Sequence, residues 1–283
     1  MSVGEPMIII DKFKDALFRI VPYVEKYKNE KHIEIEFRLG FIETSPTYFN
    51  TDIPVDFFNK IKKKLNSNKN WASVQNSKTT DYFNSGVRIS VDNKRTVGEA
   101  VGEAVGEAVG EAVGEAVGEA TPSVASAGYG KAVGEATPSV PSAGYGKAVS
   151  CIRKTKLVTI NFRFEDTPFD IRFCISKEEP CVLNDVQKRI QNCNHSREKE
   201  RTRFTHKFWN FDITRVKEIE NTVENITHEI ELDVSWPVGE TSVPYIIYSS
   251  LLKINDLVNM CENVSEKSQM VFVGAKCDEK KHN

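Results

Sequence analysis

The sequence has little that is typical of a secreted or membrane protein. No apolar run approaches the roughly 18 residues that a spanning helix needs, so we expect no membrane segment. The N-terminal stretch MSVGEPMIIID has an apolar run of only four residues, too short for the core of a secretory signal. The six cysteines show no C-x-x-C spacing. We therefore expect reduced thiols in an intracellular protein, with neither a disulfide framework nor a zinc site.

The composition also excludes two other classes. A wholly disordered chain would not carry 16 Phe and 8 Tyr among 283 residues, because these side chains need a core. A general nucleic-acid-binding surface is excluded by a net charge of -2. Residues 97–149 hold seven Glu and two Lys, which leaves 36 basic and 33 acidic residues elsewhere. A site for a polyanion therefore has to come from local clustering of basic side chains.

Residues 97–149 interrupt the chain with repeats. Six copies of VGEA are followed by motifs of the form VGEATPSV-x-SAGYGK. Glycine at every fourth position lowers helix stability by roughly 1 kcal/mol per occurrence, and no large apolar face is present. We expect a flexible, acidic, low-complexity loop, with a partner-binding or self-stacking repeat as the alternative.

The flanking segments, 1–96 and 150–262, are expected to form a single domain, followed by a C-terminal tail at 263–283. Long surface insertions are tolerated because the entropy of loop closure grows slowly with length. Apolar residues at helical spacing predict helices at 8–27, 51–65 and 245–259. Period-two alternation predicts strands at 33–39, 71–76, 77–84, 87–91, 151–164, 169–176, 197–204, 208–216 and 226–234.

Two of these strands, about 190 residues apart, carry acids on one face and apolar residues on the other. HIEIEFRLG places Glu34, Glu36 and Arg38 on one face. THEIELDV places Thr227, Glu229, Glu231 and Asp233 on one face. A charged strand face is ordinarily just solvated. The strands between them, however, carry mostly basic residues in the same phase. These intervening residues are Arg88, Lys154, Lys156, Arg172, Glu178, Lys199, Arg201, Arg203, Lys207, Asp212 and Thr214.

Strands of this kind can close into a barrel with apolar faces packed outward against helices and charged faces lining the lumen. Empty, such a lumen would be unfavourable, because each desolvated charge costs several kcal/mol. A metal cation and a polyphosphate would complete it. Side chains at i and i+2 lie about 6.6 Å apart on a strand, so two adjacent Glu pairs would surround one point. Oxygen ligands suit Mg²⁺ or Mn²⁺, and the absence of His and Cys from these faces argues against zinc.

The two acidic strands, IEIEFRLG and HEIELDV, resemble the signature strands of the triphosphate tunnel metalloenzymes. The order of VRIS, IRKTK, DIRFCISKE, RTRF and FDIT between them resembles the RNA triphosphatases of fungal, protozoan and large-DNA-virus mRNA capping systems. The resemblance covers most of residues 30–235 outside the repeats. It implies an α+β, mainly β fold, with an eight-stranded antiparallel β-barrel and packing helices. It also implies a metal-dependent polynucleotide 5′-triphosphatase that removes the γ-phosphate of 5′-triphosphate RNA in the first step of mRNA cap formation.

The resemblance further implies a role for each matching position. The divalent metal, Mg²⁺ or Mn²⁺, would be held by Glu34, Glu36, Glu229 and Glu231. Phosphates would be contacted by Arg88, Lys154, Lys156, Arg201 and Arg203. Glu178 would position or activate the attacking water, while Asp212 and Thr214 would orient the basic residues. Further candidates are Arg172, Arg38, Asp233 and Lys207.

Several alternatives stay open at this point. The E-x-E-x-[KR] pattern also fits a tunnel enzyme for inorganic triphosphate or another small triphosphate. The chain could instead be a non-catalytic module that binds polyphosphate or RNA ends, or a barrel that serves as an interaction scaffold. The capping resemblance implies guanylyltransferase and methyltransferase partners, on the same polypeptide or separate, and NTP as a second substrate. The chain itself contains no K-x-D-G nucleotidyl-transfer motif. A viral origin would place the protein in the virion or the host cytoplasm.

Overall fold

The computed structural model describes residues 11–44, 47–93, 149–165, 167–182, 184–236, 242–261 and 270–277. The predicted repeat loop therefore lies outside the described residues, apart from its last residue, Val149. The helices are η1 (Asp11–Phe13), α1 (Lys14–Tyr27), α2 (Val55–Ser67), α3 (Val186–Gln191) and α4 (Val243–Asn259). The strands are β1 (Ile33–Thr44), β2 (Thr47–Asn50), β3 (Ser73–Asn84), β4 (Val87–Asp92), β5 (Val149–Phe164), β6 (Asp170–Pro180), β7 (His195–His206), β8 (Trp209–Glu220), β9 (Val223–Val234) and β10 (Met270–Cys277).

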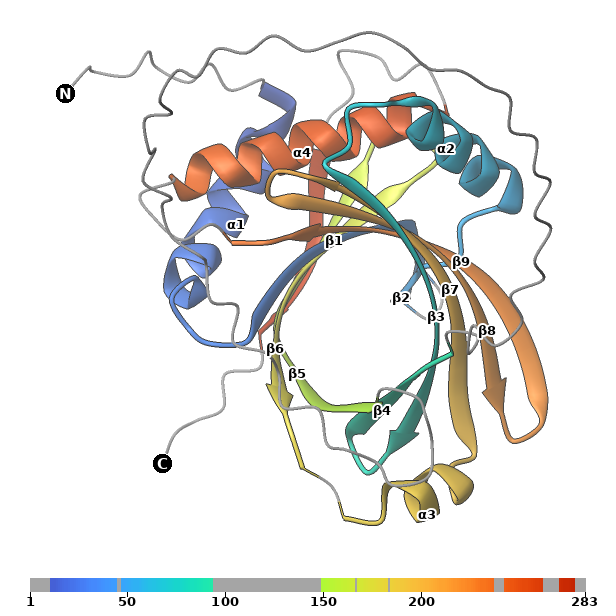
Figure 1. Cartoon of the computed structure of the whole chain (residues 1–283). Coiled ribbons are helices and arrows are strands. Elements are labelled where there is room, and N and C mark those ends of the chain that lie inside the picture. The colour runs from blue at the N-terminus through green and yellow to red at the C-terminus, as the bar shows by residue number, and fades with distance from the viewer. Residues whose placement is uncertain are drawn as a thin grey trace, which may run out of the picture.

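Eight of the ten strands close into an antiparallel barrel (Figure 1). Their order around the barrel is β1-β6-β5-β4-β3-β7-β8-β9, and β9 pairs with β1 to complete the circle. β2 lies beside the end of β1, and β10 lies beside the end of β5. The predicted eight-stranded antiparallel barrel is confirmed, with two additional strands.

The apolar faces of the barrel strands point outward, as the alternation predicts. Phe37 of β1 and Phe173 of β6 are register partners, and both rings are fully buried with centroids 5.1 Å apart. They share one core with Phe13, Ile20 and other residues of the helices α1, α2 and α4. These three helices lie on the same side of the barrel in Figure 1. Burial of a large apolar side chain is worth about 1.5–3 kcal/mol, so this face determines which way each strand is turned. The charged alternate positions are left facing the lumen.

Some elements differ from the sequence-based expectation. Residues 71–76 and 77–84 were expected to form two strands, yet 73–84 is the continuous strand β3, because all of it pairs with β7 or β4. Residues 270–277 were expected to belong to the tail and instead form β10, in which Met270 is buried and Phe272 pairs with Phe162 of β5. The short elements α3 and β2 were not predicted. Within the described part of the chain, no helix is both long and apolar enough to cross a bilayer.

Candidate active site

The barrel encloses a polar cavity of about 670 Å³, which we call the tunnel. The charged side chains that line it come from six of the eight barrel strands, at alternate positions along each strand. They are Glu34, Glu36, Arg38, Arg88, Lys154, Lys156, Glu178, Arg197, Lys199, Arg201, Arg203, Glu229, Glu231 and Asp233. Nearly all of the residues predicted from the phase of the strands are thus brought into one cavity.

An acidic cluster occupies the junction of β1 and β9. Carboxylate oxygens of Glu34, Glu36 and Asp233 lie within 4.8 Å of one another, and Glu36 and Asp233 are register partners. Burial, together with the neighbouring carboxylates Glu231 and Asp212, raises the pKa of Asp233 well above its ordinary value. The buried Oδ1 atom of Asp233 has no hydrogen-bond partner among the described residues. Each of these carboxylates also has a basic neighbour: Lys154 for Glu34, Arg38 for Glu36 and Arg203 for Asp233. Three carboxylates crowded together in this way fit a hard divalent cation such as Mg²⁺ or Mn²⁺.

Of the four glutamates expected to hold the metal, Glu34 and Glu36 lie in one group of close carboxylates with Asp233, and Glu231 lies in a second group with Asp212 and Asp233. Arg38 points between the two pairs, with Nη2 3.0 Å from Oε2 of Glu36 and 2.9 Å from Oε1 of Glu231. Glu229 lies further along β9, where its Oε1 is 2.5 Å from Nη2 of Arg197. Both Glu229 and Glu231 are therefore neutralised by arginines. Asp233, one of the further candidates, belongs to both groups of close carboxylates.

Glu178 lies in a group of charges on β6 and the strands β5 and β4 that follow it around the barrel, next to the acidic cluster. Its carboxylate accepts hydrogen bonds of 3.2 Å from Nη2 of Arg88 and lies 3.2 Å from Nζ of Lys154, its register partner on β5. Lys154 also donates a hydrogen bond to Glu34, which belongs to the acidic cluster. Burial alone would lower the pKa of Lys154, but Glu36, Glu34 and Glu178 outweigh burial and raise it. Lys154 therefore stays protonated between the cluster and Glu178.

Two arginines of β7 are held by one buried acid of β8. Arg203 donates to both carboxylate oxygens of Asp212 at 2.7 and 2.6 Å, and Nη1 of Arg201 lies 2.6 Å from Oδ2 of the same residue. Nε of Arg201 donates to Oγ1 of Thr214 at 3.2 Å. Asp212 and Thr214 are both fully buried. Bidentate pairing fixes the plane of a guanidinium, so these contacts suit the positioning role that the resemblance implies.

Two further tunnel cations had no predicted role in the site. Lys199 was predicted to share the inner face, and Arg197 precedes it on β7 in the same phase, so continuing the alternation by one step would have found Arg197 too. Lys199 lies 2.6 Å from Oδ2 of Asp81 on β3, and Ser90 donates to the other oxygen of Asp81 at 2.6 Å. The sequence offered no comparable signal for Asp81, because β3 is mostly polar on both faces.

Three predicted residues lie at or beyond the edge of the tunnel. Lys156 is exposed and lines both the tunnel and an adjoining cleft. Arg172 lines only that cleft, where its Nε donates to Oδ1 of Asn161 at 2.9 Å. Lys207 is exposed in the turn between β7 and β8 and lines neither cavity. Its positive φ of 52° marks the turn that ends β7, so the strand phase does not extend to this residue.

Comparison with known proteins agrees with this geometry. Residues 142–239 match the family model described as "mRNA capping enzyme, beta chain". The S. pombe RNA triphosphatase Pct1 has a similar fold at 15% identity, with a TM-score of 0.57, over 89% of this chain and 94% of that chain. Pct1 in complex with the Spt5 CTD is similar at 15% identity, with a TM-score of 0.51, over 90% and 89%. The Mimivirus capping enzyme triphosphatase is 15% identical, with a TM-score of 0.49, over 87% and 98%. No curated protein is similar enough in sequence to give a significant match. Residues 142–239 thus fit this family model, and the chain shares the fold of Pct1.

Proposed function

We propose that the chain removes the γ-phosphate of 5′-triphosphate RNA within the tunnel, using a divalent cation held by Glu34, Glu36 and Asp233. The family match and the tunnel fold support the reaction, which is the first step of mRNA cap formation. The observation that carries the site assignment is the convergence of these three carboxylates in a cavity that eight basic side chains also line.

The charge of the tunnel suits a triphosphate. Six acids and eight bases line it, and the buried Asp81 and Asp212 that pair with Lys199, Arg201 and Arg203 balance the remaining two charges, so a divalent cation makes the site positive overall. A 5′-triphosphate carries roughly four negative charges near neutral pH. Charges buried in a protein are stable only when they are compensated, so a metal and a triphosphate together complete the lumen.

The basic residues would stabilise the charge that develops on the phosphate oxygens. Arg201 and Arg203 are held rigidly by Asp212, and such preorganised donors need little rearrangement during the reaction. Lys154 and Arg88 lie beside Glu178, where β5 and β4 form the wall of the tunnel. Phosphoryl transfer depends on positioning and charge stabilisation, and each such donor is worth about 10²- to 10³-fold in rate. A metal bound to the acidic cluster would supply Lewis-acid polarisation of the phosphate oxygens.

Glu178 is the acid best suited to orient the attacking water. It lies outside the acidic cluster, and both of its basic partners face the tunnel. A water that donates to this carboxylate would lie next to the cations that contact the phosphate. Orientation of a nucleophile by a carboxylate contributes typically about 10²- to 10⁴-fold.

The cellular setting is part of the same proposal. The diphosphate RNA end is the substrate of a guanylyltransferase, so guanylyltransferase and methyltransferase activities are the expected partners, on the same polypeptide or separate. The resemblance to large-DNA-virus enzymes supports a viral setting, in the virion or the host cytoplasm. Free NTPs are proposed as secondary substrates, and Mg²⁺ and Mn²⁺ as the physiological metals.

Release of labelled γ-phosphate from triphosphate-ended RNA tests this function. We expect release that depends on Mg²⁺ or Mn²⁺, stops with EDTA, and is lost in Glu36→Gln. Glu200→Gln is the matched control, because Glu200 is exposed on β7 and pairs with Lys78 outside the tunnel. Hydrolysis of inorganic triphosphate but not of RNA would favour the alternative small-triphosphate enzyme. Metal-independent release, or full activity in Glu36→Gln, would contradict the proposed site.

A further inference from the structure

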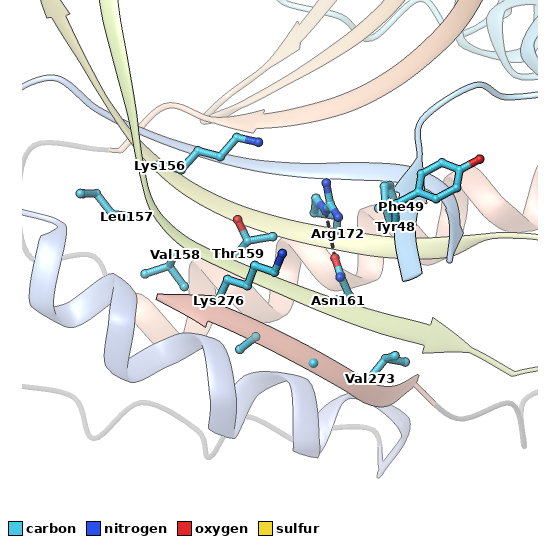
Figure 2. Close-up of a pocket in the computed structure, with 12 residues that line it drawn as sticks. Tyr48, Phe49, Lys156, Leu157, Val158, Thr159, Asn161, Arg172, Val273 and Lys276 are labelled. Carbon is cyan, nitrogen blue, oxygen red and sulfur yellow. Dashed lines mark hydrogen bonds between the residues drawn. The ribbon is translucent and has the colours of Figure 1, made fainter. Parts of the chain in front are cut away.

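A second cavity of about 400 Å³ adjoins the tunnel between β2, β5, β6 and β10 (Figure 2). We call it the cationic cleft, because Lys156, Arg172 and Lys276 line it, and no Asp or Glu does so within the described part of the chain. The remaining polar lining comes from Tyr48, Thr159 and Asn161 and from backbone atoms. The cleft therefore carries about three positive charges and no compensating negative charge of its own.

The cations of the cleft differ from those of the tunnel in their partners. Every basic residue of the tunnel described above, apart from Lys156, pairs with a carboxylate. Lys156, Arg172 and Lys276 form no such pair among the described residues, and Arg172 is held instead by Asn161 and by the ring of Phe49, 4.5 Å away. Unpaired cations gathered in a concave site are suited to bind an anion from outside the chain.

The cleft is continuous with the tunnel. Lys156 lines both cavities. Arg172 pairs in register with Arg38, which lies beside the acidic cluster, and it shares the phase of Glu178 on β6. A register shift in the β5–β6 ladder between Lys156 and Val158 turns the following residues of β5, so that Thr159 and Asn161 continue the lumen-facing surface. A molecule whose end lies in the tunnel can therefore extend into the cleft.

The cleft also offers an aromatic surface. Tyr48 of β2 lies at its rim and is 51% exposed, which is unusual for a large aromatic side chain next to a polar cavity. Figure 2 shows Tyr48 beside Phe49, close to Arg172. Cationic grooves combined with accessible aromatic rings are the common means of binding single-stranded nucleic acid without reading its sequence.

We propose that the cationic cleft binds the first ribonucleotides of the RNA whose 5′-triphosphate occupies the tunnel. Lys156, Arg172 and Lys276 contact the phosphodiesters, and Tyr48 stacks on a base. This inference rests on the proposed function, since it assigns the path of the same substrate. It also explains how a tunnel selective for triphosphates gains affinity for RNA over free triphosphate.

Steady-state kinetics with a short triphosphate-ended RNA and with inorganic triphosphate test the cleft. We expect Tyr48→Ala to raise KM for RNA about 5- to 100-fold and Tyr48→Phe to restore it, because stacking requires only the ring. We expect Lys276→Ala to reduce the slope of log KM against log salt by about 0.7, the share of one single-strand phosphate contact. Hydrolysis of inorganic triphosphate should stay unchanged in these variants. Lys188→Ala, an exposed lysine on α3 across the barrel, is the control for charge (Figure 1).

Each failure has its own outcome. Parent protein that hydrolyses inorganic triphosphate but not RNA refutes the proposed function. The cleft is refuted if the parent protein acts on RNA and the KM for RNA is unchanged in Tyr48→Ala and Lys276→Ala. It is also refuted if these variants impair hydrolysis of RNA and of inorganic triphosphate equally. Fluorescence anisotropy of triphosphate-ended RNA in EDTA measures binding without turnover. RNA binding should weaken in Tyr48→Ala and Lys276→Ala but not in Lys188→Ala. Equal binding by all three variants would overturn the inference.

Discussion

Arg38 and Glu231 form an ion pair of 2.9 Å across the junction of β1 and β9. The two residues are register partners on β1 and β9, so the pair follows from the strand alignment. Burial alone would raise the pKa of Glu231, but Arg38, Arg201 and Lys199 outweigh it and lower this pKa to about 2. Glu231 therefore keeps its charge without a metal, whereas burial and the neighbouring carboxylates raise the pKa of Asp233.

The different surroundings of Asp233 and Glu229 predict different metal affinities for two conservative variants. Asp233→Asn removes a carboxylate of the acidic cluster and should weaken Mn²⁺ binding about 100-fold or more. Glu229→Gln removes a carboxylate that Arg197 already neutralises, and should change Mn²⁺ affinity little. Calorimetric titration of each variant with Mn²⁺ gives the dissociation constants. Equal losses in both variants would restore the four-glutamate metal set in place of the cluster.

Glu178 is predicted to affect turnover more than binding. Glu178→Gln keeps the shape of the side chain but weakens its acceptance of a hydrogen bond from water, so kcat should fall about 10²- to 10⁴-fold. KM should change only a few-fold, since the phosphate-binding cations remain in place. Glu179→Gln, on the exposed face of the same strand, should behave like the parent. A rise in KM with unchanged kcat would assign Glu178 to substrate binding.

Asp212 is predicted to matter for stability as well as activity. Its carboxylate is fully buried between the partly exposed Arg201 and Arg203, so Asp212→Asn leaves these arginines with only Glu231 and Asp233 as acidic partners. Loss of one partner from a fully buried ion pair costs about 3–5 kcal/mol, and we expect a smaller drop in the free energy of unfolding because solvent reaches both arginines. Urea denaturation monitored by circular dichroism measures it. Wild-type stability with lowered activity would mean that the arginines find other partners.

The pair of Asp81 and Lys199 predicts a pH dependence. Burial alone would raise the pKa of Asp81, but Lys199 and Ser90 outweigh it, so the folded-state pKa lies below the ordinary value. The stability gained from this carboxylate is complete above the unfolded pKa of about 3.9 and is lost as pH falls through the folded-state pKa. The difference in unfolding free energy between parent and Asp81→Asn should therefore be largest near neutral pH and shrink below about pH 4. If the difference in unfolding free energy between parent and Asp81→Asn grows as the pH falls, the sign of this prediction is wrong.

The repeat segment is predicted to be dispensable for folding. Val91 of β4 and Val149 of β5 are antiparallel register partners, so the two ends of the segment lie next to each other. Replacement of residues 94–148 by a short glycine-containing turn should preserve phosphate release and raise the free energy of unfolding by up to about 2 kcal/mol, through lower loop-closure entropy. Thermal denaturation and the γ-phosphate assay check both expectations. Loss of folding would give the repeats a structural role.

Much of the barrel could be predicted from alternation, because a period of two assigns each strand residue to one of two faces. Elements without that signal were missed. β2 is only four residues long, and β10 pairs with only one end of β5. The register shift after Lys156, which changes the face on which the following residues of β5 lie, was also missed, because a bulge requires no particular residue type. The alternation that assigned Lys199, Arg201 and Arg203 to the inner face also extends to Arg197.

The sequence by itself determined which side chains share the inner surface, because apolar burial turns every strand the same way. Only the tertiary structure decided which of those charges meet. The alignment of β1 with β9 sets Glu36 beside Asp233 and Arg38 beside Glu231. A shift of two residues would keep every side chain on its face and still assemble a different acidic cluster, and periodicity carries no information about such a shift.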